Sequence, residues 1–173
     1  MKTDPVLARV RSNTYQALRM LIENSCIMQD GAQTYSDVCL AREYGTIRLC
    51  STRQAGHTHS IARMAVKYFD NVLFLSPNQK MSSHLAEVVL GVIKERVTIR
   101  KQTISEIEFE NGSNYLFRTT TRKDVLDVVR GYDLDAVVVD GTFDLSKKME
   151  DEIYQVCLPC MIKNSRKFFI FVQ

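Results

Sequence analysis

The sequence predicts a single α/β domain in which helices cover both faces of a mainly parallel β-sheet. Short runs of β-branched and aromatic residues alternate along the chain with segments of helical periodicity, which is the order that builds parallel strands joined by helices. The chain has 173 residues, 45% of them hydrophobic, which is enough to bury one core. No repeat or linker divides it, so we expect one domain over residues 1–173.

The first element, at about residues 4–28, is predicted to be an amphipathic helix. Asp4 and Pro5 form an N-cap and first-turn pair at its start. One helical stripe is expected to carry the apolar residues Val6, Val10, Ala17, Leu18, Leu21 and Ile22.

Strands of the buried type follow, because several short apolar runs are bounded by turn residues. They are expected at residues 46–50, 71–75, 136–140 and 167–172. Helices are expected at residues 36–43, 58–69, 79–94, 121–129 and 147–157. Residues 104–117 alternate apolar and polar residues around Asn111-Gly112, which is the strongest short-range signal for a β-hairpin.

Composition narrows the class of protein. The net charge of +3 and the pI near 8.6 are too mild to indicate nucleic-acid binding by themselves. No run approaches the roughly 18 apolar residues of a membrane span, and the N-terminus lacks a signal-peptide core. Five cysteines, scattered through apolar segments, are typical of reduced thiols. We therefore expect a cytoplasmic protein without a membrane partner.

Residues 51–60 follow the first strand and open a helix, and their composition is that of an anion-binding loop. Gly56 lets the backbone come close to a ligand, and a helix N-terminus favours a bound phosphate. In the general pattern a lysine follows this glycine and reaches the phosphates, and the next Ser or Thr hydroxyl binds magnesium. Here those positions hold His57 and Thr58.

A second strand ends in an acidic residue. Residues 136–140 read Ala-Val-Val-Val-Asp, so that Asp140 is a candidate magnesium carboxylate at the end of a buried strand. The next residue, where a catalytic glutamate is expected, is Gly141. Asp144 is the nearest carboxylate that could replace it.

These motifs, in their order, resemble the ATPase domain of the large terminase subunit, a viral DNA-packaging motor of bacteriophages and a helicase-like P-loop NTPase of the ASCE class. The loop at residues 53–58 resembles the family's Arg-Gln-x-Gly-Lys-Ser/Thr, and residues 72–79 are similar to its second-strand motif. The hairpin, the Arg-Gly turn at residues 130–131 and the acidic strand at residues 135–140 follow in the family's order. The resemblance covers roughly residues 30–173. It implies a sequence that is C-terminally truncated relative to the family, without the family's final core strand and nuclease domain.

The resemblance implies a set of site residues. Nucleotide is expected at Arg53, Gln54, Gly56, His57 and Thr58, and magnesium at Thr58 and Asp140. Both motifs are degenerate, since the imidazole of His57 is shorter than lysine and largely neutral near pH 7. Arg53 could supply a permanent cation. Gly141 is expected to slow hydrolysis, because loss of a general base typically costs on the order of a hundred- to ten-thousandfold.

Other residues have a structural interpretation as well as a functional one. Arg118, Arg122, Lys123 and Arg130 are either a DNA-binding surface or a solvated helix face. His57 and His59 either contact phosphate or face solvent at the helix start. Cys157 and Cys160 have the spacing of a zinc or redox motif and could join the two histidines, but zinc is the less favoured reading because this motif closes a helix.

Three functions remain open. The first is a catalytically defective terminase-like domain that binds DNA, nucleotide or a motor protein in viral DNA packaging or processing, in the cytoplasm of an infected host. The second is an active ATPase with ATP and magnesium as cofactors, using Arg53 and a neighbouring subunit of a homo-oligomer. The third is a protein-interaction scaffold without nucleotide binding.

Overall fold

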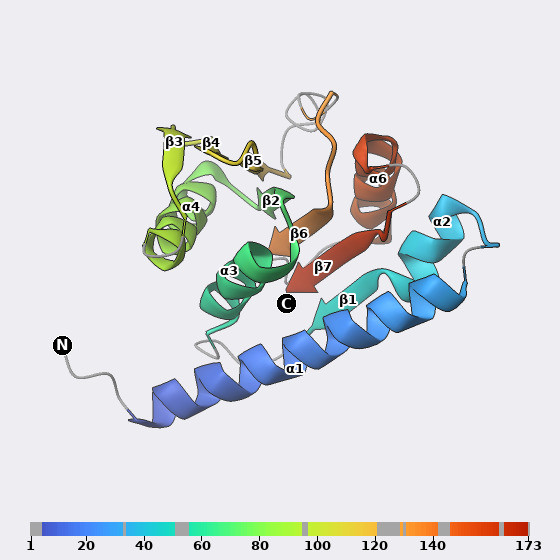
Figure 1. The fold of residues 1–173 in the computed structure, drawn as a ribbon, viewed down its shortest axis with the longest axis horizontal. Helices are drawn as coiled ribbons and strands as arrows, with labels where there is room; N and C mark the ends of the chain where they lie inside the picture. Colours follow the sequence, from blue (N-terminus) through green and yellow to red (C-terminus); the bar gives the residue numbers. More distant parts are fainter. Residues whose placement is uncertain are drawn as a thin grey trace.

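A computed structural model describes residues 5–32, 34–50, 56–94, 97–120, 129, 131–141, 146–162 and 165–172. These residues form a seven-stranded mixed sheet with helices on both faces (Figure 1). The strand order is β1-β7-β6-β2-β5-β4-β3. The α/β class expected from the sequence is therefore confirmed.

The elements follow the predicted alternation closely. The strands are β1 (Thr46–Leu49), β2 (Asn71–Ser76), β3 (Ile99–Gln102), β4 (Glu106–Phe109), β5 (Asn114–Thr119), β6 (Ala136–Asp140) and β7 (Phe168–Val172). The helices are α1 (Pro5–Gly31), α2 (Asp37–Cys39), the π-helix η1 (Leu40–Tyr44), α3 (His57–Tyr68), α4 (Gln79–Ile93), α6 (Lys147–Cys157) and the 3₁₀-helix η2 (Leu158–Cys160). The helix expected at residues 121–129 falls almost wholly outside the described residues.

Five of the described strands form the parallel part of the sheet. Strand β7 pairs with both β1 and β6, and β2 pairs with both β6 and β5, in each case parallel. The interior strands β7 and β2 are almost entirely buried, as continuous apolar runs in a doubly covered parallel sheet should be. Strand β1 is therefore separated from the acidic strand β6 by one intervening strand.

The predicted hairpin is confirmed, and it continues into a strand that the sequence did not predict. Strands β4 and β5 pair antiparallel, and Gly112 has φ 88° in the turn between them. Strand β3 then pairs antiparallel with β4 at the sheet edge. Its residues are mostly exposed, so it lacks the alternating apolar pattern that marks a half-buried strand.

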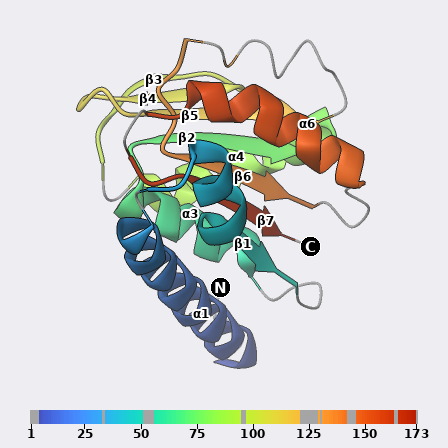
Figure 2. The ribbon, with the colours of Figure 1, turned by 90° about the vertical axis from the view of Figure 1, so that its right-hand side faces the viewer.

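Alternate residues of the strands point into two separate cores. One core holds Phe74, Val138 and Ile170 together with side chains of α1, α3 and α4. The other holds Leu73, Val139 and Phe171 together with side chains of η1 and α6. Figure 2 shows α1 and α6 on opposite sides of the sheet.

No helix among the described residues is long and apolar enough to cross a membrane.

Helix α1 differs from its predicted amphipathic pattern. Leu18 and Ile22 are fully buried as expected, but Val6, Val10, Ala17 and Leu21 are exposed. Two polar residues, Ser25 and Gln29, lie on the buried face instead. The prediction placed one broad stripe on the core, whereas the helix buries a narrower stripe about 100° away from most of the exposed residues.

Gln29 explains why a polar side chain is buried there. Its amide Nε2 donates to the backbone oxygen of Lys167 at 3.0 Å, and the Lys167 backbone N–H donates to Gln29 Oε1 at 2.7 Å. Both backbone groups lie just before β7, where they would otherwise be buried without partners. Helix α1 is thus joined to the segment just before β7 by two hydrogen bonds.

Gly45 provides a test of this arrangement. A Cβ atom at this position would overlap the backbone oxygen of Lys167, whereas a Cβ atom at Gly91 meets nothing within 4 Å. We expect Gly45→Ala to destabilise the chain by about 2 kcal/mol or more, because backbone atoms must move. Gly91→Ala, inside helix α4, should stabilise it by about 0.5–1 kcal/mol. Denaturant unfolding checks both values, and equal effects would contradict the packing described.

Candidate functional site

The parallel register sets the ends of two strands level with each other. Val172 of β7 pairs with Leu49 of β1 on one side and with Asp140 of β6 on the other. Leu49 and Asp140 therefore lie in one row, two strand spacings or roughly 10 Å apart. They are at the carboxyl ends of parallel strands, which is where ligands bind in open α/β sheets.

The loop after β1 ends at Gly56, the residue that precedes α3. Gly56 has φ 72°, in the left-handed region, and a Cβ atom there would overlap the side chain of Arg11. Both facts favour glycine. Helix α3 begins at His57, so its first backbone N–H groups lie at this edge of the sheet. Arg53 and Gln54, two of the expected nucleotide residues, lie outside the described residues.

Thr58 and Asp140 are in direct contact. The Thr58 hydroxyl Oγ1 donates to Asp140 Oδ2 at 2.9 Å, although the two residues are 82 positions apart. Burial raises the pKa of Asp140, and the hydrogen bond from Thr58, the nearby rings of His57 and His84, and the Gly141 N–H partly oppose this rise. The site is therefore a desolvated carboxylate held against a hydroxyl.

His57 is adjacent to this pair and does not behave as a cation. Burial lowers its pKa, and the nearby carboxylate of Asp140 only partly offsets the effect. The ring is therefore predominantly neutral at pH 7, because even the unperturbed pKa is about 6.5. This agrees with the expectation that His57 replaces a lysine poorly.

The residue after Asp140 is constrained to glycine. Gly141 has φ 84°, and a Cβ atom would lie 2.5 Å from Met81 Cε and 3.5 Å from Pro77 Cδ. Methionine can move, but the left-handed backbone disfavours any L side chain. A glutamate at this position would therefore need a different backbone conformation. Asp144, the expected replacement, lies outside the described residues.

Arg11 is a site residue that the sequence analysis missed. Its side chain packs against Gly56, and its backbone oxygen accepts from the Ser60 hydroxyl at 3.4 Å. Among the described residues, Arg11 Nε is buried and has no hydrogen-bond partner. A signal did exist, because Arg11 shares the helical face of Leu18 and Ile22, where a charged side chain is unexpected.

Of the four candidate DNA-binding residues, the structure describes only Arg118. Its Nη1 donates to the backbone oxygens of Ser105 at 2.6 Å and Phe117 at 2.9 Å. These bonds tie β5 to the turn before β4, which is a structural role. Arg122, Lys123 and Arg130 lie outside the described residues.

The cysteine motif lies far from the histidines in the fold. Cys157 and Cys160 pack in the core between the sheet and α6, whereas α3, which begins at His57, covers the other face. Burial raises the pKa of Cys157 to about 12, so this thiol stays protonated. Within the described part of the chain, no group of three His, Cys, Asp or Glu side chains could hold a metal ion.

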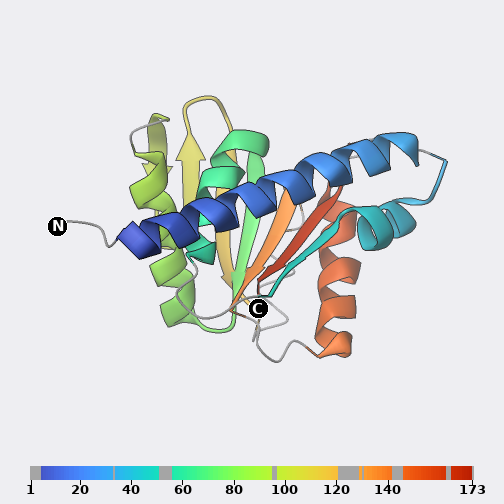
Figure 3. The same cartoon turned by 90° about the horizontal axis from the view of Figure 1, so that it is seen from below.

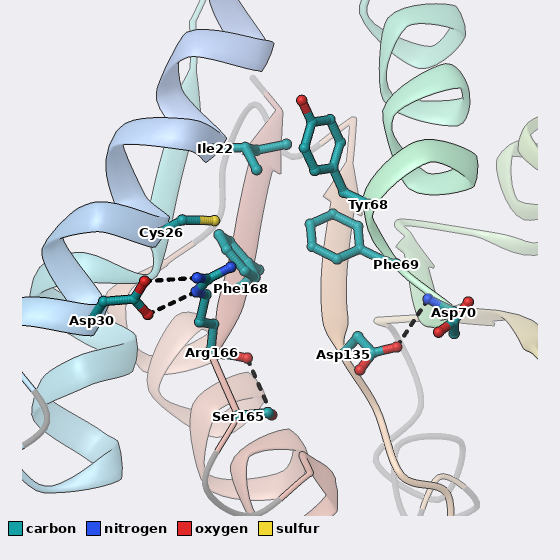
Figure 4. Close-up of a pocket in the computed structure, with 10 residues that line it drawn as sticks. All are labelled: Ile22, Cys26, Asp30, Tyr68, Phe69, Asp70, Asp135, Ser165, Arg166 and Phe168. Carbon is teal, nitrogen blue, oxygen red and sulfur yellow. Dashed lines mark hydrogen bonds and ion pairs between the residues drawn. The ribbon is translucent and has the colours of Figure 1, made fainter.

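A cavity of about 410 Å³ opens at the opposite end of the strands, between α1 and the starts of β2 and β7 (Figure 4). Its charged groups already have partners. Arg166 pairs with Asp30 through two hydrogen bonds of 2.9 and 2.7 Å. Asp135 Oδ2 accepts from the backbone N–H groups of Asp70 and Asn71 at 2.9 and 2.8 Å. These contacts join α1 and β6 to neighbouring segments, so the cavity is a structural junction.

No protein-family model and no curated protein matches this sequence. Solved structures of the large terminase from a thermophilic bacteriophage are similar in fold. One crystal form gives a TM-score of 0.56 at 12% identity and covers 79% of this chain and 37% of the terminase. A second form gives 0.51 at 14% identity, with 74% and 32% covered. The same terminase in complex with ADP gives 0.50 at 13% identity, with 79% and 36% covered. The chain thus has a terminase-like fold and spans about a third of that protein.

The buried carboxylate of Asp140 leads to a stability prediction. Because its folded pKa is raised, folding binds a proton more tightly, and stability falls as the pH rises through the folded pKa. Asp140→Asn removes this cost while its amide oxygen can still accept from Thr58. We expect stability at pH 7 to stay equal or rise by up to about 1 kcal/mol.

Asp135→Asn is the matched control. Asp135 accepts two backbone N–H bonds, so the same substitution there should cost about 1 kcal/mol by weakening charge-assisted bonds. Denaturant unfolding at several pH values measures both variants. A clear loss of stability in Asp140→Asn at pH 7 would show that the carboxylate is structural.

Proposed function

We propose that this chain is a terminase-like domain that binds nucleotide phosphates with magnesium, is defective in hydrolysis, and acts by binding DNA or a motor protein in viral DNA packaging or processing. The fold supports this reading only in outline, because a shared architecture does not determine activity. The proposal therefore depends on the chemistry at the carboxyl-terminal ends of β1 and β6.

The contact between Thr58 and Asp140 is the observation that carries the proposal. A hydroxyl and a carboxylate in contact are oxygen ligands of the kind that magnesium prefers, so these two residues fit the ion. The ion, when bound, would neutralise phosphate charge. Burying a carboxylate without a cationic partner costs stability, and a residue that carries such a cost is a candidate for function.

The start of α3 would supply the phosphate-binding groups. Its N-terminal N–H groups follow the left-handed Gly56, and this arrangement favours anions. His57 adds little charge, since its pKa is lowered by burial. We infer that Arg11 contributes the missing cation from α1. The aliphatic part of its side chain lies against Gly56, and its Nε lacks a partner among the described residues.

In the described part of the site, the position after Asp140 has no side chain that could activate water. The position after Asp140 is Gly141, in a backbone conformation that disfavours glutamate. Thr58 and Asp140 are hydrogen-bonded to each other and would both bind the ion, so they would not activate water. Binding without appreciable turnover is therefore the expected behaviour.

Calorimetric titration with ADP or ATP, with and without magnesium, tests the proposal, because one of the similar terminase structures contains ADP. We expect magnesium-dependent binding that Asp140→Asn abolishes, and no phosphate release above background. Absence of any binding would favour the scaffold function. Phosphate release that disappears in Asp140→Asn would instead show an active ATPase.

The role of Arg11 can be tested with a substitution that keeps its packing. We expect Arg11→Met to weaken nucleotide binding about tenfold or more, because a charge-assisted hydrogen bond to phosphate is lost. Arg63→Met is the matched control, since Arg63 also has a buried, unpartnered Nε among the described residues but lies 4.4 Å over the Tyr15 ring, further along α3. Equal affinities of the two variants would rule out the role of Arg11.

A further inference from the structure

Helix α1 carries a second apolar stripe that is separate from its core-facing one. Val6, Met20, Ile27 and Met28 are between 54% and 70% exposed, and Val10 is 37% exposed. The core-facing residues lie on a different face, roughly 130° around the helix. Figure 3 shows α1 crossing the molecule in front of the sheet. The second stripe is thus left largely open to solvent by the described elements.

All of these residues except Met28 belong, with Asn13, Ala17 and Asn24, to a series that has the spacing of a coiled-coil seam. Its residues follow one another at intervals of four and three, without interruption, for about 32 Å of helix. They are Val6, Val10, Asn13, Ala17, Met20, Asn24 and Ile27, all exposed. We define these seven residues as the seam. A pattern this regular is not needed to pack α1 on its own sheet.

The seam is complementary to itself when two copies run antiparallel. One such register places Val10 opposite Ile27 of the second copy. Asn13 faces Asn24, so that two side-chain amides can hydrogen-bond to each other. Ala17 faces Met20, a small residue against a large one. A twofold axis repeats each pair, as an isologous interface requires.

The flanking residues agree with the same register. On one side of the seam Arg9 would lie near Asp30 of the second copy, which already pairs with its own Arg166. Gln16 would lie near Glu23, whose carboxylate already accepts from Arg19 and the Tyr68 hydroxyl. On the other side Leu21 would lie near Thr14. Arg9, Gln16, Leu21 and Asp30 are exposed in the chain alone. No pair in this register brings like charges together.

We propose that the α1 seam binds a second copy of this chain and forms an antiparallel, twofold-symmetric dimer. A lipid surface fits less well, because two of the seven seam positions are asparagines, whose amides would be unsatisfied among acyl chains. In the second copy each asparagine has a matching amide. The core-facing stripe points away from the seam, so the two sheets lie outside the helix pair.

Sedimentation equilibrium over a range of concentrations tests the dimer. We expect a reversible monomer–dimer equilibrium whose Kd rises at least about tenfold in Ile27→Glu, because the charge enters the interface twice. Ile104→Glu is the matched control, since Ile104 is 69% exposed, against 70% for Ile27, and lies outside α1. It should leave the Kd unchanged, and circular dichroism should show both variants folded.

The register is tested by cross-linking Asn13→Cys/Asn24→Cys under mild oxidation, with peptide mapping to separate the new link from native cysteines. A link between position 13 of one copy and position 24 of the other is expected. Links that join 13 to 13 and 24 to 24 would show a parallel pair and overturn the proposal. A chain that stays monomeric, that responds equally to Ile27→Glu and Ile104→Glu, or that binds vesicles through the seam would also overturn it.

Discussion

The parallel pairing of β7 between β1 and β6 is the constraint on which the site depends. One residue, Val172, pairs with Leu49 on one side and Asp140 on the other. This register places the end of β1, where the loop to α3 begins, level with Asp140 at the end of β6. Helix α3 then has to start close to Asp140, and the Thr58 hydroxyl reaches it. Without β7 the two segments would have no common frame, because no described ladder pairs β1 with β6 directly.

Under the proposed function, the site combines features that favour a bound phosphate with features that disfavour hydrolysis. Its carboxylate is buried at a cost, which is reasonable where a cation is to be bound. The position where the terminase resemblance implies a lysine holds His57, whose pKa is lowered, and the position where it implies a glutamate holds Gly141, in a left-handed conformation. Gly141 has a left-handed backbone, so a glutamate introduced at this position would conflict with the turn that follows β6. Binding and turnover are separable in such a site.

Helix α1 takes part in three arrangements, two through its core-facing side and one through the seam. Leu18, Ile22 and Gln29 attach it to the sheet and to the start of β7. Arg11, on the same side but nearer the N-terminus, packs against Gly56 at the candidate site. The seam lies on a separate face. Dimer formation through the seam would leave Arg11 and the carboxyl edge of the sheet outside the helix pair, so the two proposals stand or fall separately.

The sequence alone determined the elements and their order. Apolar runs such as residues 136–140, the Asn111-Gly112 turn and the described helical segments are local patterns, and each was found within a few residues of its predicted place. Local patterns also identified Thr58 and Asp140 as candidates. They did not reveal β3, whose residues are mostly exposed, because an edge strand of this kind is defined by its partner β4 rather than by its own composition.

Only the tertiary structure decided which side chains meet. The contact between Thr58 and Asp140 spans 82 positions, and Arg11 packs on Gly56 from a helix that precedes β1. The periodicity of α1 showed that apolar residues recur but not which of its stripes faces the sheet. The broad stripe predicted was wrong for Val6, Val10, Ala17 and Leu21. The physical reason is that periodicity reports the geometry of one helix or strand. Burial, charge pairing and pKa shifts depend on neighbours that chain folding brings from distant positions.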